Sequence, residues 1–233
     1  MEFNIEKYHL KSSSFFDYLD KEEARLVKSK MLRKEYSKGE FLFKEKSFSK
    51  GVYFIRKGKV KIFQTNSEGK QSIVYIYKKG DYFGYRPILA EESHPVSAMA
   101  MDNVVVNLLP KEHFKNLLNK SSTLSAKLLT VLSKEFSVWI NKMTTFTHYA
   151  VKERVALSLL ILHNIYARND LKKNKKTSIM IGRDDFAGFV GTAKETLVRT
   201  LRFYKDYRYI ISTGTKIQII NKKGLIDIVT ELL

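Results

Sequence analysis

The 233-residue sequence contains no cysteine, and this absence removes several kinds of chemistry at once. Disulfide bonds, thiolate-held zinc, cysteine-ligated iron–sulfur clusters and a cysteine nucleophile are all excluded. The segment Met1–Lys7 lacks the apolar core of a secretory signal. The longest nearly apolar run, Val155–Leu162, is far shorter than the roughly 20 residues that a membrane span needs. We therefore expect a soluble protein of the reducing cytoplasm, without a membrane partner.

The motifs of common enzymes are also missing. The sequence has no His-x-His pair, no phosphate-cradling loop and no nucleophile elbow. An enzyme built on a small β-barrel is therefore disfavoured, and we predict no catalytic residue, no metal ligand and no identifiable cofactor. Haem held by one of the five histidines stays an open alternative, but no spacing selects a ligand, and we expect His94 and His113 to be ordinary surface residues.

Positive charge is what the sequence has in excess. Its 42 Lys and Arg outnumber 24 Asp and Glu, and the formal net charge is +18. A field of this sign favours a polyanion, most often nucleic acid. A membrane surface, an acidic protein or a generally lysine-rich proteome would also account for it. Residues 148–233 carry 16 Lys and Arg against 8 Asp and Glu, only modestly more basic than the rest, so charge alone does not locate an interface.

Short apolar segments separated by glycine occupy the first half of the chain. A helix is expected within Phe15–Arg33, with Asp20 at its start. From Tyr36 to Leu109, segments rich in β-branched and aromatic residues predict many short strands, and Asn66–Gly69 is typical of a hairpin turn. This pattern indicates a small antiparallel sandwich or barrel.

Residues 120–147 have a different pattern, without Gly or Pro, in which large apolar residues recur at steps of three and four. This spacing is that of a coiled-coil seam. It has two interpretations, a helix buried in its own core or a two-stranded dimer interface. We favour the dimer because the seam persists through nearly three heptads and an exposed tryptophan would be unfavourable. The seam residues are Leu129, Leu132, Phe136, Trp139, Met143 and Phe146.

The C-terminal part contains the most informative pattern. A helix is expected at Val151–Ala167, followed by a polar, basic connection at Asn169–Lys176. The segment Gly182–Leu201 then predicts two short helices with a tight turn at Gly191, the arrangement of a helix-turn-helix.

The start and the inner face of the second helix can be predicted residue by residue. Thr192 and Glu195 are typical of a capping box, with the hydroxyl at the N-cap. Leu197, Val198 and Leu201 are then expected to face inward.

The outer face of this helix would carry Lys194, Glu195, Arg199 and Arg202. Glu195 and Arg199 are four residues apart and project side by side. An arginine can bond both O6 and N7 of guanine, and a carboxylate can accept from N4 of cytosine. The alternative is a surface ion pair, and both can hold together. Beyond this helix, Tyr209–Ile220 reads as strand, turn and strand, which is a wing, and the whole arrangement predicts DNA binding.

Over almost its whole length the chain resembles the cyclic-AMP receptor protein/fumarate–nitrate regulator family of bacterial transcription factors. The resemblance is carried by Lys152–Ala156, by Val190–Arg199 and by the glycines Gly39, Gly58, Gly69 and Gly80-Asp81-Tyr82-Phe83-Gly84. It implies an α+β fold with an antiparallel, cyclic-nucleotide-binding-like β-roll at residues 1–119. A dimerisation helix at 120–147 and a winged helix-turn-helix at 148–233 would follow.

The resemblance also implies a homodimeric, sequence-specific transcription regulator on palindromic double-stranded DNA, with RNA polymerase as a further partner. Glu195 and Arg199 match the family's base-reading pair, and Lys194 matches a residue that contacts base or phosphate. Arg183 and Thr192 match phosphate-contacting positions. The expected DNA-binding set is Arg183, Thr192, Lys194, Glu195, Thr196, Arg199 and Arg202, while Ala193 replaces a frequent serine. The alternative function is a sensor module that acts through protein contacts without specific DNA binding.

The resemblance fails at the sensor. Cyclic-nucleotide binders of the family follow the glycine of the roll with a glutamate for the ribose, and place Arg-Ser further along for the phosphate. Here Tyr85 and Arg86 follow Gly84, and no arginine precedes Ser97. A buried cyclic phosphate would lack its cation, so we expect that cyclic AMP is not used in the usual way.

The candidate effector pocket is therefore made of Gly84, Tyr85, Arg86 and Ser97. Arg86 would either meet an acidic ligand or pair with a carboxylate of the protein. An empty pocket in a constitutively active regulator is a further alternative.

Overall fold

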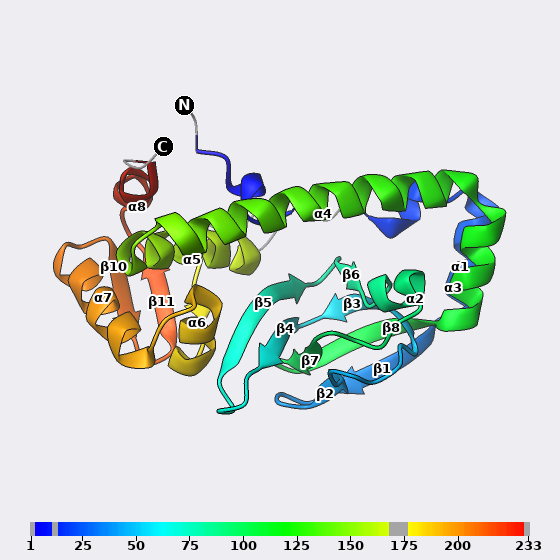
Figure 1. Ribbon diagram of the computed structural model, residues 1–233, viewed down its shortest axis with the longest axis horizontal. Helices are drawn as coiled ribbons and strands as arrows, with labels where there is room; N and C mark the ends of the chain where they lie inside the picture. The colour runs from blue at the N-terminus through cyan, green and yellow to red at the C-terminus, as the bar shows by residue number, and fades with distance from the viewer. Residues whose placement is uncertain (1–2, 11–13, 168–176, 231–233) are drawn as a thin grey trace. The chain divides into compact units, whose positions relative to one another are not determined.

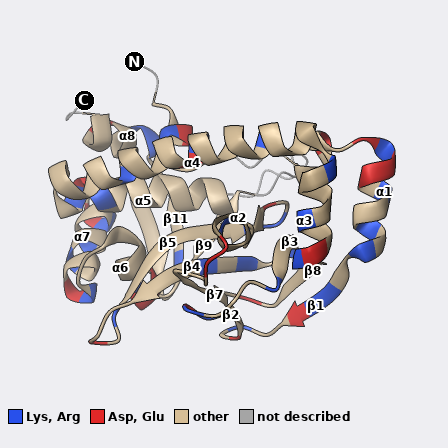
Figure 2. Cartoon of the chain, turned by 45° about the vertical axis from the view of Figure 1, so that its right-hand side comes forward, with Lys and Arg blue, Asp and Glu red and all other residues tan. Residues whose placement is uncertain are grey.

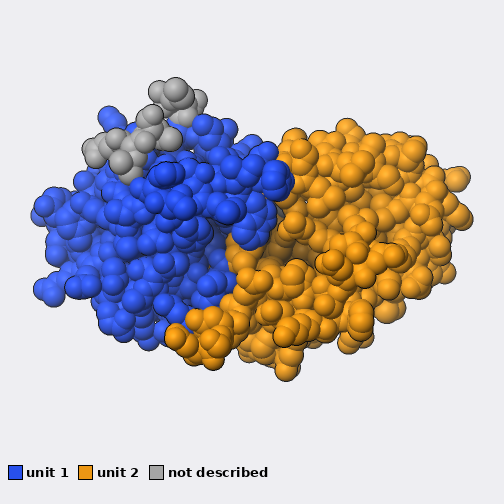
Figure 3. Space-filling view, in the orientation of Figure 1, with its two compact units in different colours: residues 1–10, 69–73, 136–233 blue, residues 11–68, 74–135 orange. Residues whose placement is uncertain are grey.

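The computed structural model describes residues 3–10, 14–167 and 177–230, and the chain forms two compact units. One unit comprises residues 11–68 and 74–135, and the other comprises residues 1–10, 69–73 and 136–233 (Figure 3). The expected architecture is confirmed: antiparallel sheets come first, then one long helix, then a winged helix-turn-helix (Figure 1). The connection expected at Asn169–Lys176 lies outside the described residues.

Two four-stranded sheets, in the orders β1-β8-β3-β6 and β2-β7-β4-β5, form the β-domain. Their inner faces meet in a core that includes Tyr53, Val60, Ala98 and Val106. Because β3 and β4 each bury four or more successive residues, they read in the sequence as nearly continuous apolar runs. The strands are β1 (Leu32–Tyr36), β2 (Phe41–Phe43), β3 (Gly51–Lys57), β4 (Lys59–Thr65), β5 (Gln71–Lys78), β6 (Tyr82–Phe83), β7 (Ser97–Ala100) and β8 (Val104–Pro110).

The predicted start of the first α-helix is confirmed. The Asp20 carboxylate accepts the Glu23 N–H at 2.8 Å, and the Glu23 carboxylate accepts the Asp20 N–H at 3.0 Å, which is a capping box. The helix is shorter than the expected Phe15–Arg33, because Leu32 already pairs with β8 as part of β1. In the described residues before α4, the helices are η1 (Ile5–Lys7), η2 (Phe15–Tyr18), α1 (Lys21–Lys30), α2 (Arg86–Ala90) and α3 (Lys111–Lys120).

The long helix α4 (Ser122–His148) forms as expected, and its first turns are anchored in the β-domain. Leu124 and Leu128 are buried in a core with Phe114 and Tyr85. Further along, the helix exposes a row of large apolar side chains, which includes Ile140. Of the seam residues, Leu129, Phe136, Met143 and Phe146 are exposed, whereas Leu132 and Trp139 are half-buried.

Within the described residues 148–167 and 177–230, the C-terminal part contains four helices after α4 and a three-stranded sheet in the order β10-β11-β9. From Val155 to Leu162, every residue of α5 is buried, which explains the longest apolar run of the sequence. β10 and β11 pair antiparallel around Gly214, and this hairpin is the expected wing. The elements are α5 (Val151–Tyr166), β9 (Ile179–Met180), α6 (Arg183–Val190), α7 (Lys194–Asp206), β10 (Ile210–Thr213), β11 (Lys216–Ile219) and α8 (Lys222–Thr230). None of the helices in the described ranges is both long and apolar enough to cross a bilayer.

His94 is not the surface residue that we expected. Its ring stacks on Phe43 with centroids 3.6 Å apart, and only 1% of the residue is exposed. Desolvation lowers the pKa of its imidazole to about 4, so the ring is neutral at pH 7. A neutral imidazole can replace an aromatic core residue, which sequence spacing does not reveal. His113 is exposed, as expected.

The turn between β3 and β4 depends on Gly58. Its φ is +86°, and a Cβ there would lie 2.6 Å from Asp102 Oδ1 and 2.7 Å from the Asn103 carbonyl oxygen. The same Asp102 carboxylate accepts the Lys59 N–H at 2.8 Å. The carboxylate cannot move away without losing this bond, so no side chain fits at residue 58.

We predict that Gly58→Ala lowers the free energy of unfolding by about 2–4 kcal/mol, because backbone strain and steric overlap add. Gly39→Ala is the matched control, because Gly39 has a φ of +88° and nothing within 4 Å of the added Cβ. Gly39→Ala should lower the free energy of unfolding by about 1 kcal/mol. Urea unfolding of both variants measures the difference, and equal losses would contradict the steric part of this explanation.

Candidate nucleic-acid interface and sensor site

The turn of the helix-turn-helix is fixed by Gly191. This residue ends α6 in the left-handed conformation, with φ 70° and ψ 49°. A Cβ on Gly191 would lie 2.6 Å from the Phe146 ring, so the position requires glycine for space as well as for conformation. Arg154 Nη1 donates to the Gly191 carbonyl at 3.2 Å and holds the turn against α5. The sequence predicted the turn but not the role of Arg154 in holding it. The one signal for that role was the resemblance of Lys152–Ala156 to the family.

The prediction that Thr192 caps the second helix is wrong. The N–H groups of Gly191 and Thr192 both donate to the Ala187 carbonyl, at 2.9 and 3.1 Å, and this keeps Thr192 in the turn. The N-cap of α7 is therefore Ala193, whose side chain makes no capping bond. Glu195 becomes the second residue of the helix, so the capping box does not form. Its carboxylate still lies in the first turn, where the helix dipole favours negative charge.

The inner face of α7 is made of Leu197, Leu201 and Tyr204, which are all buried. The inward placement that we expected for Val198 is wrong, because 46% of this side chain is exposed. Consecutive helical residues are rotated by about 100°, so the residue after Leu197 leaves the buried stripe.

The outer face of α7 presents both signs of charge (Figure 2). Lys194, Glu195, Arg199 and Arg202 are all exposed there, as the sequence predicted. In the described part of the chain no ion pair joins Glu195 to Arg199, so the surface ion pair that was the alternative does not form. Arg199 Nη2 instead donates to Thr196 Oγ1 at 3.4 Å.

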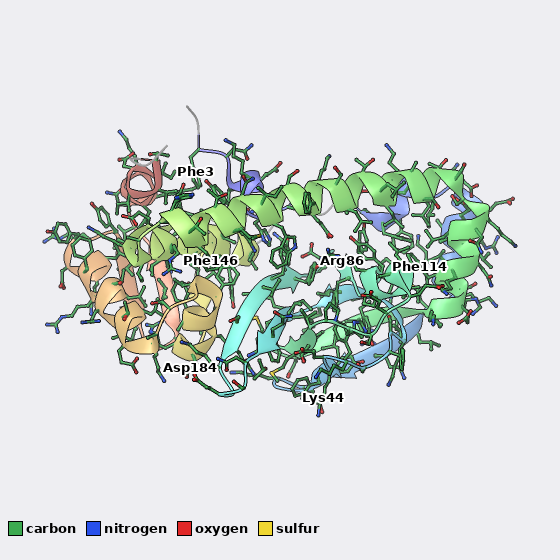
Figure 4. All side chains as sticks on the ribbon, in the orientation of Figure 1. Phe3, Lys44, Arg86, Phe114, Phe146 and Asp184 are labelled. Atoms are coloured by element: carbon green, nitrogen blue, oxygen red, sulfur yellow. The ribbon has the colours of Figure 1, made fainter. Side chains whose placement is uncertain are left out.

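Two of the other expected DNA-binding residues have partners within the protein. Lys194 Nζ lies 3.0 Å from a carboxylate oxygen of Asp184, which is labelled in Figure 4. Arg183, the first residue of α6, donates from Nη2 to Ser212 Oγ and to the Gly214 carbonyl, both at 2.7 Å. Partial burial lowers the pKa of its guanidinium. Arg183 thus fastens the wing to α6, and its side chain is not fully available to a phosphate.

At the sensor, Tyr85 points into the protein rather than toward a ligand. It is 1% exposed, and its hydroxyl donates to Glu135 Oε1 of α4 at 3.0 Å. Burial raises the pKa of the Glu135 carboxyl, while the bond from Tyr85 and the charge of Arg86 lower it in part. Burial also raises the pKa of the nearby Tyr77 hydroxyl. Sequence reasoning missed Glu135, because it lies far along the chain on a helix that was interpreted only as an interface.

Of the remaining pocket candidates, Ser97 lies apart from Tyr85, whereas Gly84 and Arg86 are its neighbours in the chain. Ser97 is buried in the other sheet, and its Oγ accepts the Glu45 N–H at 3.0 Å. Gly84 has a φ of +89°, and a Cβ there would lie 3.0 Å from Tyr53 Cδ2, so the turn before α2 favours glycine. Arg86, labelled in Figure 4, is exposed at the start of α2 and acts electrostatically on Glu135.

These groups do not fit a cyclic nucleotide. The position that the resemblance assigns to the phosphate, before Ser97, has no arginine, and Tyr85 after the glycine of the roll donates to the half-buried carboxyl group of Glu135. An anion brought beside Glu135 would be repelled, or would force it to remain protonated.

Comparison with known proteins gives one matching family model and several relatives. Residues 33–121 match the family model "Cyclic nucleotide-binding domain". The transcriptional activator protein Anr of Pseudomonas protegens is 26% identical over 79% of this chain and 75% of its own length. The cyclic AMP receptor protein of Thermus thermophilus is 24% identical over 82% of this chain and 85% of its own length. These relatives are named as transcription regulators or receptors and not as enzymes.

Solved structures agree in fold. FixK2 from Bradyrhizobium japonicum matches with a TM-score of 0.75 at 21% identity, covering 85% of this chain and 96% of its own. A transcriptional regulator of the CRP/FNR family from Thermus thermophilus matches with a TM-score of 0.68 at 18% identity, covering 87% of this chain and all of its own. By sequence and by fold, the chain is therefore similar to the Crp/Fnr transcription regulators, and its residues 33–121 match the model of a cyclic nucleotide-binding domain.

Proposed function

We propose that the protein is a cytoplasmic, homodimeric transcription regulator that binds a palindromic DNA sequence. The observation that carries this proposal is the outer face of α7. Glu195 and Arg199 lie there four residues apart, exposed, and not paired with each other. An unpaired guanidinium and carboxylate on a short helix after a tight turn are suited to reading guanine and cytosine edges in the major groove.

The other exposed residues of the interface have supporting roles in this proposal. Lys194 and Arg202 lie on the same face, and each can contact a phosphate or a base. The first N–H groups of α7 receive no bond from a capping side chain, so they too can face a phosphate. Arg183 acts indirectly, because it holds the wing beside α6.

A dimer is supported by the exposed row on α4. Leu129, Phe136, Ile140 and Met143 follow the spacing of a coiled-coil seam, and between about half and two-thirds of each is exposed. A monomer that left these side chains in water would carry an unusual apolar surface. Two copies joined along this row would present two recognition helices to successive major grooves, about 34 Å apart.

The proposal includes a sensor that does not use cyclic AMP in the usual way. It rests on two observations: no arginine precedes Ser97, the position that the resemblance assigns to the phosphate, and Tyr85, which follows Gly84, donates to the carboxyl group of Glu135. The same hydrogen bond ties the turn between β6 and α2 to α4, because Tyr85 is the N-cap of α2. Contact with RNA polymerase is part of the proposal by likeness to the relatives.

The second candidate is a module that acts only through protein contacts. It would leave the charged face of α7 without a role. DNA selection distinguishes the two, since only the regulator enriches a preferred duplex.

Selection from random duplexes should return a two-fold symmetric site, with an affinity that falls steeply as salt rises. We expect Arg199→Ala to lose about 1–3 kcal/mol of discrimination at one G·C pair per half-site. Lys223→Ala, which removes an exposed cation on α8, is the control and should keep the sequence preference. If Arg199→Ala weakened binding equally on every sequence, the residue would contact only phosphate.

Phe136→Lys should shift the protein from dimer to monomer, because it places a charge in the centre of the seam in both copies. We expect the dissociation constant to rise at least about tenfold in sedimentation equilibrium. Lys134→Ala, on a different side of α4 and also exposed, should leave the mass unchanged. An unaltered mass for Phe136→Lys would exclude this face as the interface.

Cyclic AMP at millimolar concentration should change neither the melting temperature nor the affinity for the selected DNA. A ligand at a hundred times its dissociation constant would stabilise the folded state by about 2.7 kcal/mol, which a thermal melt detects easily. The same sample must bind its DNA, so that an inactive preparation is ruled out. A raised melting temperature with cyclic AMP would contradict the sensor part of the proposal.

A further inference from the structure

Residues 3–10, here called the strap, pack against the second half of α4, although the two are far apart in the sequence (Figure 1). The strap contains a single helical turn, η1, which the side chain of Asn4 caps by accepting the Glu6 N–H at 2.9 Å. So short a helix is not stable by itself in water. Tyr8 and His9 are nevertheless only 6% and 3% exposed, so neighbouring elements cover them.

Two hydrogen bonds hold the strap at the end of α4. Asn141 Nδ2 donates to the Lys7 carbonyl at 2.9 Å. The Tyr8 hydroxyl lies 3.4 Å from the Tyr149 hydroxyl, and both tyrosines are buried. Burial and this bond raise the pKa of the Tyr8 hydroxyl, so the phenol stays neutral. The strap is therefore attached both to α4 and to the residue that follows it.

Tyr149 stands at the junction between α4 and α5. The first helix ends at His148, and the second begins at Val151 with Ala150 as its N-cap, whose ψ is 164°. Only two residues thus connect the helices, and their backbone torsions set the angle between them. Because Tyr8 binds one of these two residues, it limits how far that angle can change.

The strap leaves the exposed apolar row of α4 free. Met143 is two residues beyond Asn141, which places the two side chains about 200° apart around the helix. Met143 and Phe136 remain 64% and 67% exposed. The strap and a second copy of the chain can therefore occupy α4 together.

We propose that Tyr8 is a positioning residue that fixes the spacing between the two half-sites of the DNA. This inference rests on the proposed function, which joins two copies along α4 and places α7 of each copy in a major groove. In such a dimer, the junction between α4 and α5 links the interface to each recognition helix. The junction angle decides how far apart the two helices stand, and the strap holds that angle.

A change of one base pair between the half-sites is a large displacement for the protein. It moves one half-site by about 3.4 Å along the duplex and rotates it by about 35°, since 10–10.5 base pairs complete a turn. A dimer whose junctions are held loses contacts on such a duplex, whereas a dimer with loose junctions can follow. The strap should therefore make the protein reject duplexes with altered spacing.

Duplexes of altered spacing test this role. One base pair is inserted at, or removed from, the centre of the selected palindrome, and the dissociation constant is divided by that of the original duplex. We expect this ratio to fall at least about fivefold in Tyr8→Ala, the factor that corresponds to one lost hydrogen bond. Tyr8→Phe keeps the buried ring and should retain more of the ratio. Base changes inside a half-site should have the same effect in every variant.

Further variants and measurements keep the result from depending on one substitution. Asn141→Ala removes the other bond to the strap from the α4 side, and it should lower the same ratio. Glu6→Gln changes an exposed residue of the strap and should leave the ratio unchanged. The Tyr149 amide, which donates to the Thr145 carbonyl at 3.1 Å, should exchange its hydrogen faster in Tyr8→Ala. Sedimentation shows whether each variant is still a dimer.

The outcomes separate this inference from the proposed function. If a palindrome is selected and Tyr8→Ala rejects altered spacing as strongly as the unmodified protein, the strap does not set the spacing, and the regulator stands. If Tyr8→Ala binds every spacing more weakly by the same factor, Tyr8 only stabilises the fold, and the inference is wrong. If no preferred site is selected, both are wrong. A selective gain of tolerance for altered spacing supports the inference.

Discussion

The left-handed turn at Gly191 is the constraint on which the rest of the C-terminal unit depends. It ends α6, directs the chain into α7 and thereby decides which side of α7 is buried. The Phe146 ring occupies the space where a Cβ would be, and Arg154 binds the carbonyl of the turn. Residues from α4 and α5 thus fix the rotation of α7 within this unit. A small change of that rotation would carry Glu195 and Arg199 off the outer face.

The polar side chains of α7 and those beside the start of α4 lie in different environments. On α7 the charged groups remain exposed, and this is what a surface that binds a polyanion needs. In the β-domain the buried Tyr85 hydroxyl donates to the half-buried carboxylate of Glu135 on α4. A buried carboxyl group is unfavourable when ionised, so the bond from Tyr85 and the nearby charge of Arg86 offset part of that penalty.

Much of the fold could be predicted from local sequence signals. Glycines marked the turns, the apolar spacing marked α4, and the Gly182–Leu201 segment indicated the helix-turn-helix. The sequence predictions were wrong or incomplete where the position of a residue depended on its exact rotation on a helix or on a partner distant in sequence. Thr192 is not the N-cap, because its N–H donates to the Ala187 carbonyl and closes the turn at Gly191. Val198 lies outside the buried stripe, because it is one residue beyond Leu197 on the helix. His94 entered the core by stacking on Phe43. Glu135 and Arg154 were missed because their partners are distant in sequence.

The central claim is that the outer face of α7 contacts base edges in the major groove. Protection of guanine N7 from methylation by dimethyl sulfate tests this most directly, because N7 is exposed only in that groove. On its selected duplex the protein should protect guanines in two segments, centred about one helical turn apart. A footprint of the same length in which every guanine N7 remained reactive would contradict the account.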